Sequence, residues 1–361
     1  MNLKEFSHRI GLSPTTVSRA LNGYPEVSER TRRKVLESAE RLGYTPNSRA
    51  ARLATGRAMT IGHILPLSKE HEMVNPIFSD FIAGAGEQYS KSGYDLSLSV
   101  VQDEDEAEAY RDLATRGVVD GAVIHGPKVE DPRIRLLGEL GLPFVVHGRS
   151  SRVQGEYNWV DVNNRRAFSR ATEFLLDLGH RRIGLINGLD GMDFATRRLN
   201  GYGDALAAHG IDRDPELVFS GEMTENYGFA TTMQMLGSRN PPTAILISSI
   251  IPAMGARRAL HDLGIGLGDE VSVVIHDDDL SYFRNEGDIP IFTATRSSVR
   301  EAGRLCADIL LDTIRGARDE RRHVLLEADL TVGQSTGPAP AMRHLIDRDR
   351  AEALRRPQAL T

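Results

Sequence analysis

The chain has 361 residues, of which 40% are hydrophobic and 26% are charged, and its formal net charge is −6. This composition is typical of a soluble folded protein and excludes a fibrous or disordered one, and the length predicts two or three domains. The single cysteine, Cys306, excludes an intrachain disulfide and argues against a cysteine-based zinc site. The first ten residues are too charged for a signal peptide, and no apolar run is long enough to span a membrane. We therefore expect a cytoplasmic protein.

Residues 1–46 have the periodicity of three short helices. The apolar residues of segment 3–10 fall on one face of a helix. Ser13 followed by Pro14 is a strong start signal for a second helix, and a third is predicted over residues 30–43. Two helices joined by a short turn that contains glycine are typical of a helix–turn–helix unit, whose second helix enters the major groove of DNA.

The second helix presents polar side chains at its N-terminal end, where a recognition helix reaches base edges and phosphates. A guanidinium such as that of Arg19 can pair with guanine through two hydrogen bonds, which are worth about 1–3 kcal/mol of discrimination. The candidate DNA-contacting residues of this unit are Ser13, Pro14, Thr15, Thr16, Ser18, Arg19 and Asn22. A small helical protein–protein module is the alternative interpretation.

Charge is unevenly distributed along the chain. Residues 1–57 contain eleven Lys and Arg against five Glu and no Asp, a formal charge of +6, so the other 304 residues carry −12. Such asymmetry is typical of a basic nucleic-acid-binding head on an acidic body, although a solvated basic helix face gives the same count. Together with the helix–turn–helix pattern, the distribution favours DNA as a partner.

From Thr60 onward, apolar strands alternate with amphipathic helices. This alternation predicts an α/β fold of doubly wound parallel sheets with helices on both faces, and its length predicts two such units. A last helix at 299–316 precedes a predicted strand pair within 323–336. Residues 338–361 contain three Pro, many charges and no periodicity, and they predict a disordered tail.

Arg198 and Asp277 are the main ligand candidates in the body. Each lies close to the carboxyl end of a predicted parallel strand, at 182–188 and 271–276, where open α/β sheets bind ligands. A guanidinium and a carboxylate suit sugar hydroxyls, which both donate and accept hydrogen bonds. A structural salt bridge is the alternative for either residue. Three consecutive aspartates begin at Asp277 and point different ways, so we expect one ligand carboxylate and no metal site.

Two segments of the head, LKEFSHRIGLSPTTVSRALNG at 3–23 and VSERTRRKVLESAERLGYTPNSRAARLATGR at 27–57, resemble the DNA-binding domain of the LacI/GalR family of bacterial transcription regulators. The body resembles the regulatory domain of that family, which is built like a type I periplasmic sugar-binding protein. The stretches that carry this second resemblance are NPIF (75–78), LPFVVHGR (142–149), NN (163–164), LGHRRIGLING (178–188), RRLNGY (197–202), TAILISS (243–249) and VSVVIHDD (271–278).

The resemblance implies a domain organisation. A helix–turn–helix domain at 1–46 precedes a hinge helix and linker at 47–59 and an effector-binding regulatory domain at 60–337. Within that regulatory domain, the N-lobe is expected at about 60–161 and 292–323, and the C-lobe at about 162–291 and 324–337.

Residues 47–57 alone predict a flexible tether, since so short and polar a segment is not a stable isolated helix. The resemblance implies instead a hinge helix that folds on DNA, pairs with its dimer mate and inserts a leucine into the minor groove. Leu53 matches that leucine, with Asn47 and Ala50 on the contacting side. An apolar wedge of this kind kinks the duplex so that it contacts more protein surface.

The resemblance also implies an effector site in the body. Arg198 and Asp277 coincide with an effector-binding Arg and Asp of the family, and Phe78 stands in the place of a pocket aromatic. The pocket chemistry departs from the family at other positions. These are Met223, where a stacking aromatic is frequent; Ser249, in place of an Asn; and Arg149, the polar group beside Gly148 where many members have Asp or Asn. The segment VVHGR followed by SS is similar to members that respond to glucosides.

We therefore expect a repressor of a carbohydrate-utilisation operon that binds a palindromic double-stranded operator as a homodimer, under the control of a mono- or disaccharide effector. No enzyme activity, cofactor, metal or membrane partner is expected, because no nucleophile constellation, paired carboxylates or phosphate loop stands at a strand end. The alternative is a sugar-binding transport or sensor protein without DNA function, which the helical head disfavours.

Overall fold

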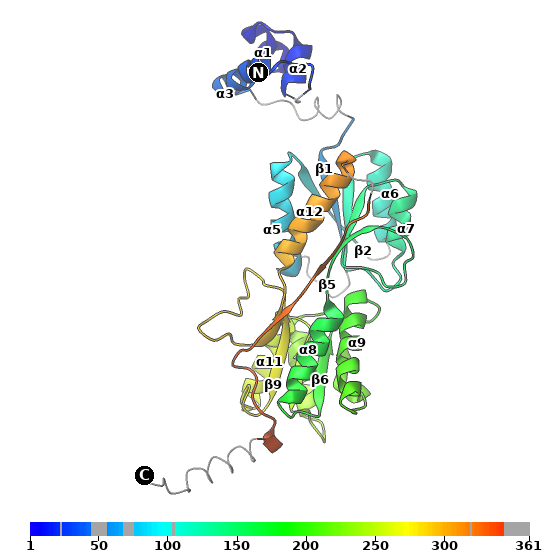
Figure 1. Ribbon diagram of the computed structural model, residues 1–361, viewed down its shortest axis with the longest axis vertical. Coiled ribbons are helices and arrows are strands. Elements are labelled where there is room, and N and C mark those ends of the chain that lie inside the picture. Colours follow the sequence, from blue (N-terminus) through cyan, green and yellow to red (C-terminus); the bar gives the residue numbers. More distant parts are fainter. Residues whose placement is uncertain (22–23, 45–55, 68–75, 103–104, 318–319, 343–361) are drawn as a thin grey trace, which may run out of the picture.

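A computed structural model describes the chain over residues 1–21, 24–44, 56–67, 76–102, 105–317 and 320–342. A helical head and two α/β lobes follow one another along the long axis of the molecule, with the N-lobe in the middle (Figure 1). No helix among the described residues is sufficiently long and apolar to cross a membrane.

The head consists of three helices, α1 (Leu3–Ile10), α2 (Pro14–Leu21) and α3 (Glu29–Leu42). They enclose a small core in which Phe6 and Val35 are fully buried and Phe6 stacks on Tyr44. The chain ends α1 at Gly11, whose φ of 70° is a backbone conformation that glycine adopts without strain. This small core holds α1 and α2 at a fixed angle.

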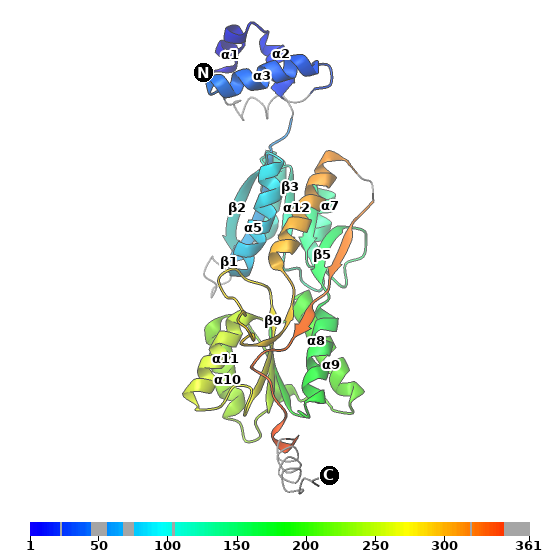
Figure 2. The ribbon, with the colours of Figure 1, turned by 60° about the vertical axis from the view of Figure 1, so that its left-hand side comes forward.

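The N-lobe is a six-stranded parallel sheet with helices on both faces. Its strand order is β11-β5-β4-β3-β1-β2. The strands are β1 (Thr60–Leu67), β2 (Asp95–Gln102), β3 (Gly121–His125), β4 (Phe144–His147), β5 (Asn158–Val162) and β11 (His323–Leu326). The helices are α5 (Pro76–Lys91), α6 (Glu106–Arg116), α7 (Pro132–Glu139) and α12 (Val299–Arg315). Helices α5 and α12 pack side by side on one face, as Figure 2 shows.

The C-lobe repeats this architecture with strand order β12-β10-β9-β8-β6-β7. Its strands are β6 (Ile183–Asn187), β7 (Val218–Ser220), β8 (Ala244–Ile247), β9 (Ser272–Asp277), β10 (Thr293–Arg296) and β12 (Asp329–Thr331). Its helices are α8 (Asn164–Asp177), α9 (Asp193–Ala208), the short 3-10 helix η2 (Pro215–Leu217), α10 (Glu225–Leu236) and α11 (Ile250–Asp262). The two lobes confirm the predicted α/β fold with mostly parallel sheets.

Two short strands lie in the other lobe from the one predicted. Residues 293–296, for which the sequence predicts no strand and the resemblance implies the N-lobe, form β10, which pairs in parallel with β9 of the C-lobe. Strand β11 pairs with β5 of the N-lobe, whereas β12 pairs antiparallel with β10, so β11 and β12 are not a strand pair. The chain therefore passes from lobe to lobe after β5, after β10 and between β11 and β12. The partner of so short a strand depends on contacts distant in sequence, which local periodicity does not record.

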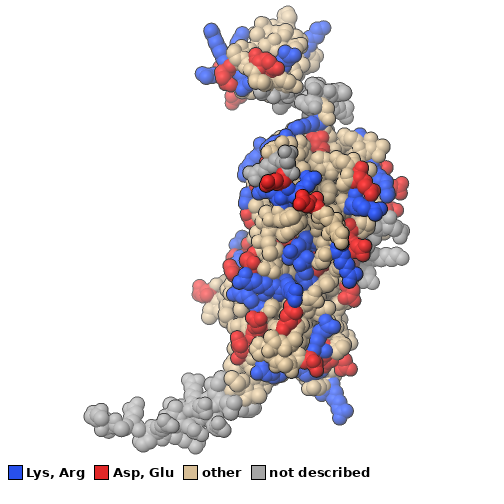
Figure 3. All heavy atoms as spheres, turned by 45° about the vertical axis from the view of Figure 1, so that its right-hand side comes forward, with Lys and Arg blue, Asp and Glu red and all other residues tan. Residues whose placement is uncertain are grey.

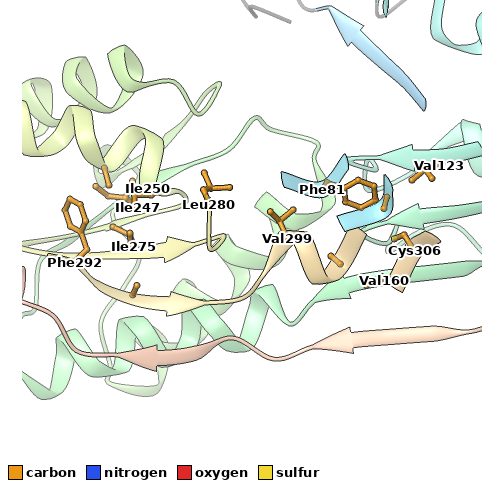
Figure 4. Packing of buried hydrophobic residues seen from close by; sticks show 14 of the residues in the cluster. Phe81, Val123, Val160, Ile247, Ile250, Ile275, Leu280, Phe292, Val299 and Cys306 are labelled. Carbon is orange, nitrogen blue, oxygen red and sulfur yellow. The ribbon is translucent and has the colours of Figure 1, made fainter. Parts of the chain in front are cut away.

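One hydrophobic cluster runs through the junction of the lobes. Phe292 and Ile275 lie at its C-lobe end, and Phe81 and Cys306 at its N-lobe end (Figure 4). Val299, at the first position of α12, stands between the two groups. The lobes therefore share one apolar core on this side.

Hydrogen bonds fix the chain where it enters the regulatory body and where it leaves it. The N–H groups of Ala58 and Met59 donate to the carboxylate of Asp120 at 2.6 and 2.9 Å, which fixes where the chain enters the N-lobe. At the other end, Ala339 is buried and its N–H donates to the carbonyl of Leu178. The prediction of a disordered tail is thus wrong for residues 338–342, and its remainder, 343–361, lies outside the described residues.

Candidate functional site

The N-terminal end of α2 is ordered by its own side chains. The Ser13 hydroxyl accepts a hydrogen bond from the N–H of Thr16 at 3.0 Å and lies 2.8 Å from the Thr16 hydroxyl. Pro14 occupies the first helical position, where the missing N–H costs nothing. Ser13 and Thr16 therefore fix the start of the helix.

One face of α2 is buried and the other is open. Val17 and Ala20 lie in the core of the head, whereas Pro14, Thr15 and Arg19 are exposed. Among the described residues, no carboxylate forms a salt bridge with Arg19, so its guanidinium is available to an external acceptor. Basic side chains project from the head, with fewer acidic ones between them (Figure 3). The other predicted DNA-contacting residues, Asn22, Asn47, Ala50 and Leu53, lie outside the described residues.

A cavity of about 520 Å³ lies between the lobes. The carboxyl ends of several parallel strands line it, namely β3 and β4 through His125 and His147 and β5 through Asp161. The C-lobe contributes Arg198 and Asp278 to the opposite wall. This is the edge of an open α/β sheet at which ligands bind, and the volume is within the range of about 300–1,000 Å³ usual for small-molecule pockets.

Arg198 is held rigidly in the C-lobe wall. Its Nε donates to Asn164 Oδ1 at 2.8 Å and its Nη1 donates to the Ser248 carbonyl at 2.5 Å. The rings of Phe168 and Phe194 lie 5.0 and 4.9 Å from its guanidinium carbon. Burial lowers the pKa of Arg198 to about 10, so it remains a cation at neutral pH.

The carboxylate that accompanies Arg198 in the cavity belongs to Asp278, and Asp277 does not line it. Asp277 accepts a hydrogen bond from the N–H of Asp279 at 2.9 Å and lies 4.0 Å from Arg296. Successive side chains at a strand end point to opposite faces, so one aspartate faces the cavity and its neighbour faces away. Burial raises the pKa of Asp278 to about 7, although Arg198 and the Ser249 hydroxyl act in the opposite direction.

The N-lobe wall combines rings with one ion pair. Phe78 and His125 line the cavity with ring centroids 5.1 Å apart. Arg149 donates through Nε to Asp161 at 2.8 Å, and its guanidinium lies over the ring of Trp159. Apolar faces with interspersed hydrogen-bonding groups can bind a polyhydroxylated ring on its faces and on its edge.

Four of the six predicted effector residues line the cavity, namely Phe78, Arg149, Arg198 and Met223. Ser249 does not, because it is buried at the N-terminus of α11, where its hydroxyl accepts from the N–H of Ile251. Asp277 is the second exception. In the part of the chain that the structure describes, no group of three or more His, Cys, Asp or Glu residues could hold a metal ion.

Sequence reasoning missed Asp278, His125 and His147. The signal for the histidines was present, because β3 and β4 each end in a His-Gly pair, and neighbouring parallel strands bring their carboxyl ends together. The sequence held no such signal for Asp278, because all six residues of β9 are buried alike and the strand period does not mark one face there.

Two family patterns match the chain. Residues 2–47 match the bacterial regulatory proteins of the lacI family, and residues 172–336 match the periplasmic binding protein-like domain. HTH-type transcriptional regulator AglR of Rhizobium meliloti (strain 1021) is 42% identical over 340 residues, which cover 94% of this chain and 95% of AglR. HTH-type transcriptional regulator RafR of Escherichia coli is 32% identical, covering 89% of this chain and 94% of RafR.

Solved structures agree with these relatives. A transcriptional regulator CelR–cellobiose complex superimposes with a TM-score of 0.69 at 29% identity, covering 93% of this chain and 99% of that one. The lac repressor dimer bound to operator and the anti-inducer ONPF gives a TM-score of 0.77 at 26% identity, with the same two coverages. The head, the two lobes and these nearly full-length similarities lead to one conclusion: the chain belongs to the lacI family of bacterial regulatory proteins and is a DNA-binding transcriptional regulator.

Proposed function

We propose that this regulator represses a carbohydrate-utilisation operon and releases its operator when a small sugar binds between the lobes. The observation that carries the proposal is the cavity itself: both lobes build it, and it lies in the same chain as an exposed recognition helix. A ligand that contacts both lobes binds one lobe arrangement better than another and so shifts their equilibrium. The regulator acts in the cytoplasm, where its operator lies.

A sugar is the effector class that suits this cavity. The wall offers cationic donors in Arg149 and Arg198, a carboxylate in Asp278 and apolar ring faces in Phe78 and Phe194. Hydroxyl groups both donate and accept hydrogen bonds, so they complement such a mixed wall. The similar CelR was solved with cellobiose, which supports a mono- or disaccharide and is in keeping with a glucoside.

The DNA-binding unit is a homodimer in this proposal. Two recognition helices one helical turn apart, about 34–36 Å, require a two-fold axis and hence a palindromic operator. A loop of the C-lobe exposes three large apolar side chains, Tyr282, Phe283 and Ile289, which suit an interface with a second copy. The similar lac repressor was solved as a dimer on its operator.

Individual contacts to DNA follow from the same proposal. Thr15 and Arg19 reach base edges from the open face of α2, and Pro14 shapes the tip of the helix. The flanking polar residues that contact phosphates are Ser13, Thr16, Ser18 and Asn22. Leu53 enters the minor groove, with Asn47 and Ala50 beside it. Arg19 is supported by its exposure and its lack of an ion pair among the described residues.

The test is a gel-shift titration of the full-length protein on DNA fragments from upstream of its own gene and of neighbouring sugar-utilisation genes. We expect a complex that survives competitor DNA at moderate salt and dissociates when the effector sugar is added. The absence of any sequence-specific complex contradicts the regulator, whereas a complex that no sugar affects contradicts the proposed effector class.

A further inference from the structure

Three histidines form a layer beneath the N-lobe wall of the cavity. His63 lies on β1, His125 at the end of β3 and His147 at the end of β4, where it is the register partner of His125. The ring centroids are 5.2 Å apart between His63 and His125 and 5.9 Å apart between His125 and His147. The outer two line the cavity, whereas His63 does not. The layer therefore presents two imidazoles to the ligand space.

The inner part of the layer is fixed by hydrogen bonds. Tyr89 Oη lies 3.1 Å from His63 Nε2, and His63 Nδ1 lies 3.0 Å from His125 Nε2. Each of these contacts is a single hydrogen bond, and together they hold the rings of His63 and His125 in place. His125 and His147 are each followed by a glycine with positive φ, Gly126 and Gly148, and the chain turns away there.

His147 differs from the other histidines of the cavity. Its ring packs against Phe81 with centroids 4.5 Å apart, and neither ring nitrogen has a hydrogen-bond partner within the described part of the chain. His276, by contrast, lies 3.1 Å from the Thr295 hydroxyl and 3.3 Å from the Ser297 hydroxyl. His147 is half-buried in the cavity wall, and neither of its nitrogens is a buried unpaired atom, so both are open to the cavity and available to a ligand.

The imidazole of His147 is uncharged at neutral pH. Burial lowers its pKa to about 4, and burial also lowers the pKa of His125 well below its ordinary value. A neutral imidazole has one donor and one acceptor nitrogen, which is the hydrogen-bonding capacity that a hydroxyl complements. It offers no positive charge to an anion.

The arginines that line the cavity are already engaged. Arg133 binds Glu106 and Asp131, and Arg149 binds Asp161. Arg198 donates to Asn164 and to the Ser248 carbonyl, so its guanidinium is also partly engaged. A phosphate needs a cluster of donors with positive charge to compensate the loss of water, and here Arg133 and Arg149 are each paired with a carboxylate.

We propose that His147, supported by His125, is an effector-contacting residue that selects an uncharged sugar through its hydroxyl groups and disfavours a phosphorylated one. The inference rests on the proposed function, because it assigns the chemistry of the same cavity. It adds a ligand contact from the N-lobe, and it predicts that the effector is a neutral sugar and not a sugar phosphate.

The first experiment measures binding by calorimetry with the full-length protein. Glucose, maltose, cellobiose, sucrose, melibiose and trehalose are titrated, and the tightest of them is compared with its own 6-phosphate. We expect the neutral sugar to bind at least tenfold more tightly than its phosphate. Equal or tighter binding of the phosphate overturns the proposal, and so does a panel in which no neutral sugar binds. A gel shift on the same preparation reports separately on the regulator function.

The second experiment tests His147 itself. His147→Leu keeps the apolar contact with Phe81 and removes both nitrogens, so we expect at least a tenfold loss of affinity for the neutral sugar with an unchanged melting temperature without sugar. His147→Asn, which keeps a donor and an acceptor, should recover part of the affinity. His209→Leu, at the exposed end of α9, is the control for a histidine replacement away from the cavity. Wild-type affinity in His147→Leu overturns the assignment.

Discussion

Asp193, at the start of α9 in the C-lobe, accepts a hydrogen bond from the N–H of Ser151 in the N-lobe at 2.9 Å, and also accepts from the Ser151 hydroxyl. Its other carboxylate oxygen binds Nε of Arg197 at 2.6 Å. Backbone bonds reinforce this contact, since the N–H of Val129 donates to the Gly191 carbonyl and the N–H of Asp193 donates to that of Pro127. The lobes are thus fastened together beside the cavity.

Replacing this carboxylate should loosen the contact between the lobes. In Asp193→Ala we expect affinity for the effector sugar to fall at least tenfold, because a hydrogen bond to a charged group contributes about 1.5–3 kcal/mol and this one joins the two lobes beside the cavity. Calorimetry measures the affinity, and small-angle scattering measures the opening of the body. Asp204→Ala, which removes the exposed partner of Arg165 within the C-lobe, is the matched control. Equal affinities in the two variants contradict a role in closure.

The two neighbouring aspartates should differ in their effect on sugar binding. Asp278 lines the cavity beside Arg198, whereas Asp277 is occupied by the N–H of Asp279. We expect Asp278→Asn to weaken sugar binding by at least tenfold and Asp277→Asn to change it less than threefold. Titration calorimetry measures the sugar affinity of both variants. A larger loss in Asp277→Asn than in Asp278→Asn would make Asp277 the ligand carboxylate.

Stability without sugar should depend on pH through Asp278. Its pKa is raised to about 7 in the folded protein by burial, above its value in the unfolded chain, so its contribution to stability is fully present below about pH 4 and is lost as pH rises through 7. The difference in unfolding free energy between Asp278→Asn and wild type should therefore shift in favour of the variant from pH 5 to pH 8, by on the order of 2 kcal/mol. Urea unfolding at both pH values measures this difference, and a constant difference contradicts the raised pKa.

Helix α9, which carries Arg198, approaches α8 closely at Gly201. A Cβ atom there would lie 2.0 Å from the Arg165 carbonyl, whereas a Cβ at Gly203 meets no atom within 4 Å. We expect Gly201→Ala to destabilise the protein by about 1–3 kcal/mol or more and to weaken sugar binding, since α9 must shift. Gly203→Ala should instead be neutral or stabilise by up to about 1 kcal/mol. Thermal unfolding of both variants tests the contrast.

On the DNA side, Arg19 should contribute specificity beyond its charge. Arg19→Ala is expected to reduce discrimination between operator and scrambled DNA by about 1–3 kcal/mol. Arg41→Ala, on the last turn of α3, removes the same charge and should weaken binding to operator and to scrambled DNA by the same factor. Fluorescence anisotropy on the two DNAs at several salt concentrations separates these effects. A uniform loss in Arg19→Ala makes Arg19 a phosphate contact only.

Local pattern was sufficient to predict the three helices of the head and the strand–helix alternation of the body. The lobe boundaries that the resemblance implies are wrong at β10 and β11, and local pattern could not correct them, because each strand has only four residues and its partner strand is remote in sequence. Local pattern also failed at Asp277, where a one-residue change in register exchanges the two faces of a strand end. The family resemblance placed a carboxylate at this strand end, but only the structure shows which of the neighbouring aspartates enters the cavity.

The hydrogen bonds of Asp120 bear on how far apart the two heads of a dimer can lie. Because its carboxylate holds the N–H groups of both Ala58 and Met59, the chain leaves the N-lobe toward the head from a fixed pivot. In a dimer there are two such pivots, and a rotation of the N-lobes changes the span between them. An operator with half-sites about 34–36 Å apart accepts only a narrow range of that span. In the proposed homodimer, the Asp120 carboxylate therefore fixes the point from which a rotation of the lobes changes the distance between the two heads.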